Sequence, residues 1–413
     1  MKTPDLLILA ASAVAFPWCV AFCAWLAAHR QMSRRVGWPL LAAVPRRRRL
    51  RLRLAVLIPA YNVAANIERA IRGALADPRT ALVVVVDGGS TDGTAEVARA
   101  CAACEGSDAN RRGSDRGGRG RGSGRRHDDE RRRRRRACAA PPVVVVEAAA
   151  GLTGRANCLN LAVCVANDHL QRTPPHAADD GDGDAYDDDG DDGDDDGDAR
   201  DDDDDGDGGG AYDGDDDAYV FLHADTVLPD GFGASVVAAL RDGRAACGAF
   251  PIYTRGVRDH PSLHVRAFGR LANGLNNLRS SWMEAPYGDQ GLCCRRSTFE
   301  AVGGFPPLPL MEDSAFVWEA RRHGAVRLLG RAVHSFASPQ WAAMGMLYVM
   351  RNYLFLTLWA AGVASPEWIH RLYYPRRALP RRVPYRKMAS QYASAPQSMV
   401  VRAGAAATRG GVR

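Results

Sequence analysis

The sequence predicts an α/β domain with a mostly parallel central sheet and helices on both of its faces. Short apolar runs of strand length alternate along the chain with longer segments whose apolar residues recur at helical spacing. Polar motifs directly follow three of the apolar runs, and ligands bind at that edge in sheets of this kind. Both observations hold once three segments of unusual composition are set aside.

Four apolar runs are predicted as strands, and a helix is predicted after each of them. The run at 81–86 does not alternate with polar residues, which is typical of a strand buried on both faces. Ile67, Ile71 and Leu75 lie on one face of the first helix. The predicted strands are Leu54–Ile58, Ala81–Val86, Val143–Val146 and Tyr219–Leu222, and the predicted helices are Ala64–Leu75, Thr94–Ala103, Arg155–Asn167 and Gly231–Leu240.

The composition divides the chain into parts. The net charge of +6 is a difference between an Arg-rich and an Asp-rich segment, so it excludes no class of partner. Both segments fall between predicted elements, where loops tolerate added length. The predicted parts are a membrane anchor (1–30), a basic juxtamembrane linker (31–53), the α/β domain (54–338) with low-complexity insertions at 105–139 and 175–217, an apolar helical extension (339–375) and a basic tail (376–413).

The N-terminal segment predicts membrane attachment. Leu6–Ala28 carries no charge and is long enough to cross a bilayer as a helix. Its length favours an uncleaved anchor over a signal peptide. Arginines gather on the C-terminal side of the segment, including the run Arg46–Arg49, so the positive-inside rule predicts a cytosolic α/β domain.

The low-complexity insertions have a simple interpretation and a specific one. The Arg/Gly-rich insertion is either an arm for RNA or anionic lipid, or a disordered surface loop, and its lack of apolar residues favours the loop. The Asp/Gly-rich insertion lacks the frame of an EF-hand, so a dedicated calcium site is not expected. The ten cysteines have no regular spacing, and Cys101 and Cys104 lack a second pair that would complete a zinc site.

Three polar motifs follow predicted strands. They are Pro59–Asn62, Asp87–Thr94 and His223–Thr226. Asp and Gly after a strand are ordinary turn residues, so each motif alone is weak evidence. Three of them at the same edge of one sheet form a constellation that indicates a binding site.

The residue types in these motifs suit a nucleoside diphosphate. Asp87 would accept hydrogen bonds from a base or ribose, or it merely closes a turn, and Gly88 would let the backbone approach closely. Asp225 is the best candidate metal ligand, because Mg²⁺ or Mn²⁺ bridging a carboxylate to a diphosphate stabilises the leaving group. His223 would join the metal, contact phosphate or serve only the structure.

Further candidates lie downstream. Arg155 opens a helix, where an anion site is expected, and Asn160 on the same helix could add a polar contact. Asp313 is the candidate general base, with Glu312 beside it to orient or tune it and Asp289 as an acceptor-side partner. Glu312 and Asp313 would also favour a helix that starts there.

Seven segments of the chain, which include the motifs described above, together resemble family 2 glycosyltransferases. The resemblance is strongest to the bacterial-type subgroup (selenodomain-associated) that carries His-Ala-Asp-Thr in place of Asp-x-Asp. The segments are Leu54–Asn62, Asp87–Thr94, Gly154–Asn160, His223–Phe232, Tyr287–Gln290, Gly303–Pro306 and Met311–Asp313.

The resemblance implies a GT-A fold, a nucleotide-sugar donor, a divalent metal (Mg²⁺ or Mn²⁺) and inversion through an aspartate base. By position it implies that Asp225 is the metal ligand and Asp313 the base. The residues that it implies for the donor site are Pro59, Tyr61, Asp87 and Arg155. The acceptor is not specified, and a lipid-linked one would fit a membrane anchor.

Three departures from the family pattern stand out. Val63 stands where many relatives have glutamate, and His223 replaces the first aspartate of Asp-x-Asp. Pro339 and Gln340 precede Trp341 where the subgroup has two arginines. Two alternatives therefore stay open: a catalytically weak homologue with a nucleic-acid-binding Arg/Gly insertion, and a nucleotidyltransferase of related fold. The latter would need a Gly-rich basic loop after the first strand, which the chain lacks.

The C-terminal region predicts a helix and a tail. Residues 341–363 are apolar except for Arg351 and Asn352, which disfavours a second membrane span. We expect this helix to pack on the domain or lie at a membrane interface. The residues after Pro375 are basic and are expected to touch anionic lipid or to form a solvated tail.

Overall fold

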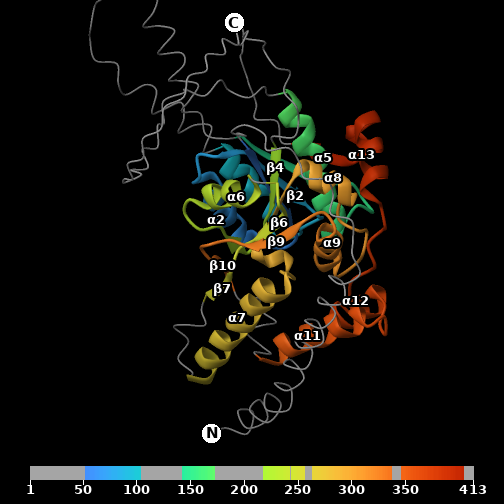
Figure 1. The fold of residues 1–413 in the computed structure, drawn as a ribbon. Coiled ribbons are helices and arrows are strands. Elements are labelled where there is room, and N and C mark those ends of the chain that lie inside the picture. Colours follow the sequence, from blue (N-terminus) through green and yellow to red (C-terminus); the bar gives the residue numbers. More distant parts are fainter. Residues whose placement is uncertain are drawn as a thin grey trace, which may run out of the picture.

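The computed structural model describes residues 52–103, 142–172, 217–241, 243–255, 263–336 and 346–403. Its centre is an eight-stranded sheet with strand order β11-β3-β2-β1-β4-β8-β6-β9 (Figure 1). Neighbouring strands are parallel except where β8 or β11 takes part, so the predicted α/β architecture with a mostly parallel sheet is confirmed. The strands are β1 (Arg53–Ala60), β2 (Thr80–Asp87), β3 (Val143–Ala148), β4 (Asp217–Phe221), β6 (Ala245–Ala249), β8 (Leu292–Arg295), β9 (Ala325–Leu328) and β11 (Val400–Ala403).

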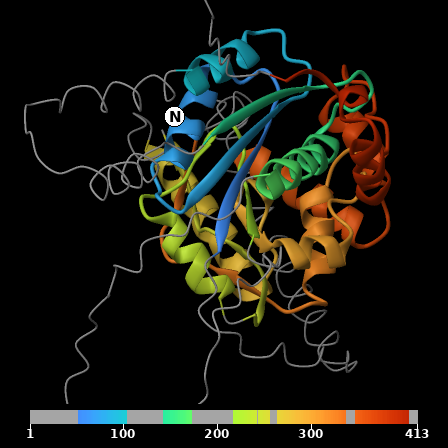
Figure 2. The same cartoon turned by 90° about the horizontal axis from the view of Figure 1, so that it is seen from above.

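Alternation along the central strands builds two hydrophobic cores. Ala55 and Leu57 of β1 enter one core, while Leu54, Val56 and Ile58 enter the other. The first core lies under α5 (Arg155–Arg172), α8 (Arg296–Val302), α9 (Glu312–Ala320) and α13 (Tyr385–Ser394). The second lies under α2 (Ala64–Leu75), α6 (Phe232–Leu240) and the helical residues 94–103, on the opposite face of the sheet (Figure 2).

The helix α2 shows how the sequence fixes these positions. Its buried residues Ile67, Ala70, Ile71 and Ala74 recur at the spacing of one helix face. Its bounds agree with the prediction from periodicity. The strands β1 to β4 likewise coincide with the four predicted apolar runs, with ends that differ by at most two residues.

A smaller layer lies beyond the end of the main sheet. A three-stranded sheet has the order β5-β10-β7, with bounds Thr226–Val227, Val333–Phe336 and Ile252–Arg255. The long helix α7 (Leu263–Met283) is tied to β7 by Asn277, whose amide bonds to the backbone N–H and C=O of Ile252 at 2.8 and 3.2 Å. The short helix η2 (Gly288–Gln290) follows α7.

The helix α11 (Met346–Ala360) packs on the domain, as one of the two predicted arrangements requires. Tyr353 and Leu356 are buried, and Trp359 stacks on Trp318 of α9 with ring centroids 4.7 Å apart. Among the described residues, no helix is both long enough and apolar enough to span a bilayer. The predicted anchor at 6–28 lies outside those residues, so it stays a prediction.

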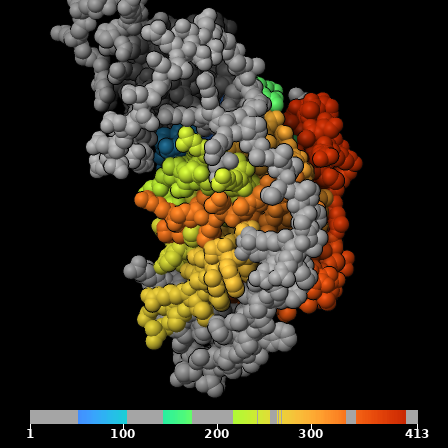
Figure 3. All heavy atoms as spheres, viewed as in Figure 1, coloured from blue at the N-terminus to red at the C-terminus, as the bar shows by residue number. Residues whose placement is uncertain are grey.

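The C-terminal residues correct the prediction of a basic tail. After α12 (Pro366–Tyr373) the chain forms α13, in which Met388 is fully buried, and then β11, which pairs with β3. The C-terminal helices line one side of the molecule (red in Figure 3). Residues 376–403 therefore belong to the packed domain, because the arginines there alternate with apolar residues that reach the core.

Two other predicted domain boundaries differ slightly from those in the structure. Arg53, predicted in the linker, starts β1 and pairs with Asp217 at 2.9 Å. Asp217, predicted as the last insertion residue, starts β4 and is fully buried. The rest of both insertions, Cys104 and the segment Pro339–Trp341 lie outside the described residues.

Candidate active site

The first two predicted motifs meet at the carboxyl edge of the sheet. β1 and β2 run parallel, so the loops that follow them emerge side by side. The N–H of Asn62 donates to Ser90 Oγ at 2.9 Å, and the N–H of Thr91 donates back to Asn62 Oδ1 at 2.9 Å. Asn62 has a left-handed backbone (φ 52°), a conformation that asparagine tolerates better than most residues. The two loops thus form one rigid rim.

Within this rim Asp87 closes the turn. Its Oδ2 accepts the N–H groups of Gly89 and Ser90 at 3.1 and 2.9 Å, and its side chain is almost fully buried. Pro59 lies within β1 opposite Val86. Tyr61 is 42% exposed, and its ring edge comes within 4.0 Å of where a side chain on Gly88 would start. Tyr61 and Gly88 therefore offer the open surface of the rim.

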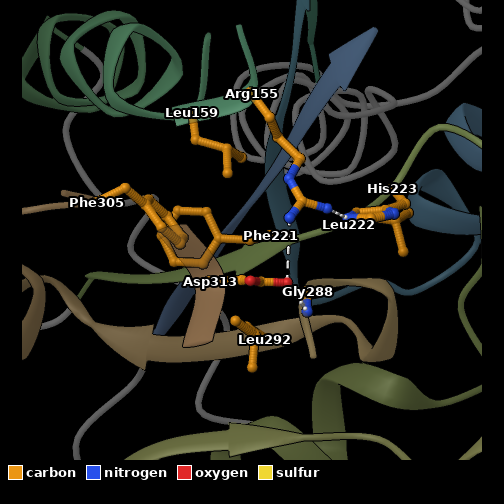
Figure 4. Close-up of a pocket in the computed structure, with 9 residues that line it drawn as sticks. All are labelled: Arg155, Leu159, Phe221, Leu222, His223, Gly288, Leu292, Phe305 and Asp313. Carbon is orange, nitrogen blue, oxygen red and sulfur yellow. Dashed lines mark hydrogen bonds and ion pairs between the residues drawn. The ribbon is translucent and has the colours of Figure 1, made fainter. Parts of the chain in front are cut away.

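Arg155 is the centre of the site. It is the first residue of α5, and its guanidinium reaches His223 and Asp313 (Figure 4). The same guanidinium also contacts Glu312. Nη1 lies 2.6 Å from His223 Nε2, Nη2 lies 3.1 Å from Asp313 Oδ2, and Nε pairs with Glu312. The structure thus brings together residues from α5, from the loop after β4 and from α9.

The contacts fix the protonation states in this group. Burial alone would lower the pKa of Arg155, but Glu312 and Asp313 raise it well above its ordinary value. Burial and the arginine lower the pKa of His223 to about 3, so its imidazole is neutral. Because an arginine only donates hydrogen bonds, His223 Nε2 accepts and the proton resides on Nδ1.

Asp313 is held as a carboxylate. Burial would raise its pKa, but Arg155 and the backbone N–H groups of Gly288 and Ser314 lower it below the ordinary value. These N–H groups donate at 2.8 and 2.7 Å. The preceding Met311 has a left-handed backbone (φ 66°), which is unfavourable for an unbranched bulky residue and occurs most often at functional sites.

Two further carboxylates complete the edge. Burial raises the pKa of Asp225. Burial also raises the pKa of Asp289 to about 6; the charges of Asp313 and Asp225 add to this effect, and Arg279 opposes it. Asp289 Oδ1 is buried and has no hydrogen-bond partner among the described residues. Asp289 therefore lies within electrostatic range of Asp225 and Asp313, and Glu312 lies within range of Asp313.

The residues at this edge fit a divalent cation that also binds a ligand. Among the described residues there is no cluster of three or more side chains that could enclose a metal ion. Mg²⁺ commonly binds through one or two carboxylates together with substrate phosphates, and Asp225 with the unpartnered Asp289 offers that kind of donor set.

Asn160 has a different place from the predicted one. It is fully buried, and its amide exchanges two hydrogen bonds of 2.9 Å with the backbone N–H and C=O of Phe305. It therefore holds the turn that contains Gly303 and Gly304, and its polar atoms do not face the edge.

Sequence reasoning missed several residues at the site. Gly288 donates its backbone N–H to Asp313, and only a structure reveals such a contact. Tyr374 lies within electrostatic range of Arg155 and Glu312. Arg279 is buried with its guanidinium 3.3 Å from the centroid of the Tyr287 ring. Tyr374 lies at the end of the predicted apolar extension, and its aromatic neighbour Tyr373 was a signal for a packed segment there.

Comparison with known proteins finds a family match for part of the chain. Residues 55–127 match the family model described as Glycosyl transferase family 2. A 47-residue segment is 53% identical to the succinoglycan biosynthesis protein ExoU of Rhizobium meliloti (strain 1021), and it spans 11% of this chain and 14% of that protein. The chain thus covers about a seventh of the length of this relative.

The solved structures that the chain matches include two transferases. One is the mannosyltransferase PcManGT of Pyrobaculum calidifontis in complex with GDP-Man and Mn²⁺ (18% identity, 95% of this chain and 87% of that one, TM-score 0.42). The other is glucosyl-3-phosphoglycerate synthase of Mycobacterium tuberculosis in complex with Mn²⁺, UDP-Glc and phosphoglyceric acid (17% identity, 76% and 80%, TM-score 0.37). The family match and the strand order together support the expected GT-A-like α/β fold.

Proposed function

We propose that this chain is an inverting glycosyltransferase that moves a sugar from a nucleoside-diphosphate donor to a hydroxyl of an acceptor. The observation that carries the proposal is the group of Arg155, His223 and Asp313 at the carboxyl edge of the sheet, beside Asp225. The family match of residues 55–127 supports it, because that segment contains the rim of Tyr61 and Asp87.

The donor lies against the rim in this proposal. Tyr61 and Gly88 offer the exposed surface that a base or ribose would cover, with Pro59 behind them in β1 and Asp87 fixing the turn. The diphosphate of the donor would extend from the rim to His223 and Arg155, which contact each other. A neutral imidazole with a proton on Nδ1 offers one hydrogen-bond donor at this point.

A divalent ion, Mg²⁺ or Mn²⁺, would be held by Asp225 and would neutralise the charge of the departing diphosphate. The carboxylate of Asp225 is partly buried at the site edge, which favours pairing with a cation over exposure to water. An Asp225→Ala variant is expected to bind a nucleoside diphosphate equally well with and without chelator. The unmodified chain should bind it more tightly with Mn²⁺.

Asp313 would take the proton of the acceptor hydroxyl as the sugar is transferred. It is ionised, as a general base must be, and Glu312 orients it through their shared partner Arg155. Asp289 is the second candidate for the base, because its pKa of about 6 lies nearer to neutral pH, where a base is most effective.

The test of this proposal compares donor binding with sugar transfer. The full chain is titrated by calorimetry with UDP, GDP and their sugars, with and without Mn²⁺, and transfer is followed by release of nucleoside diphosphate. Asp313→Asn should preserve donor binding while lowering transfer by about 10²–10⁴-fold. Asp289→Asn tests the second candidate for the base at the same edge.

Each outcome has a separate meaning. Loss of transfer only in Asp289→Asn would assign the base to Asp289. Absence of binding by any nucleoside diphosphate to a folded chain would refute a nucleotide-sugar transferase. Binding of a nucleoside triphosphate with release of diphosphate would instead support the nucleotidyltransferase alternative.

The same proposal includes attachment to a membrane with the domain on the cytosolic side and a lipid-linked acceptor. The apolar segment 6–28 and the arginines that follow it support this part. Recovery of the full chain in the membrane fraction after a carbonate wash is the expected result, and recovery in the supernatant would contradict it.

A further inference from the structure

The segment between α12 and α13 crosses the site edge. It is fixed at one end by a turn in which the N–H of Arg377 donates to the carbonyl of Tyr374 at 3.0 Å. At the other end, Asn157 of α5 donates to the carbonyl of Arg381 at 2.7 Å, and Pro380 packs against Gly154 just before Arg155. The segment is therefore anchored to the start of α5, beside the centre of the site.

One side chain of this segment reaches the rim. The guanidinium carbon of Arg377 lies 4.5 Å from the centroid of the Tyr61 ring and 4.7 Å from that of Tyr374. Tyr61 borders Gly88 on the rim, and Tyr374 is within electrostatic range of Arg155 and Glu312. Arg377 thus spans the space between the open rim and the buried group around Arg155.

The charge of Arg377 is available for a ligand. In the described ranges, no carboxylate oxygen lies within 4.0 Å of its guanidinium, and its side chain is exposed. Arg155, in contrast, is already paired with Glu312 and Asp313. Aromatic rings orient a guanidinium through its face and leave its N–H edge free to donate.

We propose that Arg377 binds the phosphate groups of the donor, an anion contact supplied by the C-terminal segment. Its planar fork of N–H donors matches phosphate oxygens, and the two tyrosine rings hold the fork at the mouth of the site. The inference rests on the proposed function, since it takes the bound ligand to be a nucleoside diphosphate.

The test measures binding of UDP and GDP to the full chain by calorimetry, with the nucleosides uridine and guanosine as phosphate-free probes. Arg377→Gln is expected to weaken binding of the preferred diphosphate roughly 10- to 100-fold and to leave binding of the matching nucleoside unchanged. Arg377→Lys should fall between the two, because lysine keeps the charge but loses the fork.

Arg376→Gln is the matched control, because it removes the same charge one position away. Arg376 is exposed, and no aromatic ring contact is recorded for it in the described structure. Equal losses in the Arg376 and Arg377 variants would overturn the inference in favour of general electrostatic attraction.

The remaining outcomes separate this inference from the proposed function. If the unmodified chain binds a nucleoside diphosphate and Arg377→Gln binds it equally well, Arg377 is not a phosphate ligand and the proposed function stands. An equal loss for nucleoside and diphosphate would also overturn the inference, because the variant would then have disturbed the rim. Absence of any diphosphate binding by the unmodified chain would refute both.

Discussion

Arg155 should stabilise the fold as well as the site, and its removal offers the sharpest test of the electrostatics. An Arg155→Met variant keeps much of the side-chain volume but leaves Glu312 and Asp313 without their cation. Their side chains are 2% and 10% exposed, so water cannot replace the lost partner. Breaking a buried ion pair by removing one member typically costs about 3–5 kcal/mol.

The expected loss for Arg155→Met is on the order of 2–4 kcal/mol, because the arginine itself is 30% exposed and partly screened. The loss should depend on pH. Without the arginine, the pKa of both carboxyl groups rises above its value in the unmodified chain, so their ionisation opposes folding more strongly as pH rises. The deficit against the unmodified chain should therefore be larger at pH 8 than at pH 5.

Urea unfolding of both chains at pH 5 and pH 8 measures this loss of stability, provided that the denaturant slope is the same for the variant and the unmodified chain. A double-mutant cycle with Glu312→Gln separates the pair from the rest of the site. The double variant should lose less stability than the sum of the single variants, by about 1–3 kcal/mol. Additive losses that do not change with pH would show that Arg155 does not stabilise the fold through its carboxylate partners.

Two further predictions concern neighbouring positions. Asp289→Asn, measured in EDTA, should stabilise the chain relative to the unmodified protein, with a gain that grows between pH 4 and about pH 6 and then levels off at about 2–3 kcal/mol. The variant gains stability because the raised pKa of Asp289 means that its ionisation destabilises the folded state. A gain that stayed constant with pH would contradict this explanation. Gly154→Ala should lower the free energy of unfolding by more than roughly 2 kcal/mol. A Cβ at this position would lie 2.6 Å from Pro380, and the backbone φ of Gly154 is 98°. Gly89→Ala is the control, because Gly89 has a similar φ of 92° but no atom within 4 Å of the added Cβ. Its free energy of unfolding is expected to fall by roughly 1 kcal/mol from backbone strain alone. Equal melting temperatures for the two variants would refute the packing argument.

The part of the fold that the sequence predicted is the part that local patterns encode. Strands β1 to β4 are apolar runs that read directly as buried strands, and α2 has one apolar face. The strand β8 was missed because Leu292–Arg295 is short and its antiparallel place between β4 and β6 depends on pairing with distant segments. Such pairing leaves no periodic signal in a four-residue strand.

The site divides in the same way. Motifs that directly follow strands predicted Tyr61, Asp87 and Asp225, because position after a strand fixes the edge on which a residue lies. The ion pair of Arg155 with Glu312 joins residues 157 positions apart, and no local pattern in the sequence indicated it. The segment around Arg377 had no such guide, and its basic composition suggested a solvated tail.

The charges at the site edge connect these observations. Arg155 interacts electrostatically with four carboxylates, those of Asp225, Asp289, Glu312 and Asp313. Arg279 supplies a second positive charge beside Asp289. The neutral His223 does not offset the excess of negative charge. A nucleoside diphosphate would add to that excess, so its binding requires cations that the buried group does not supply. A divalent ion at Asp225 and the guanidinium of Arg377 are the two that the proposals provide. If both are required, removing either should weaken diphosphate binding, and removing both should abolish it.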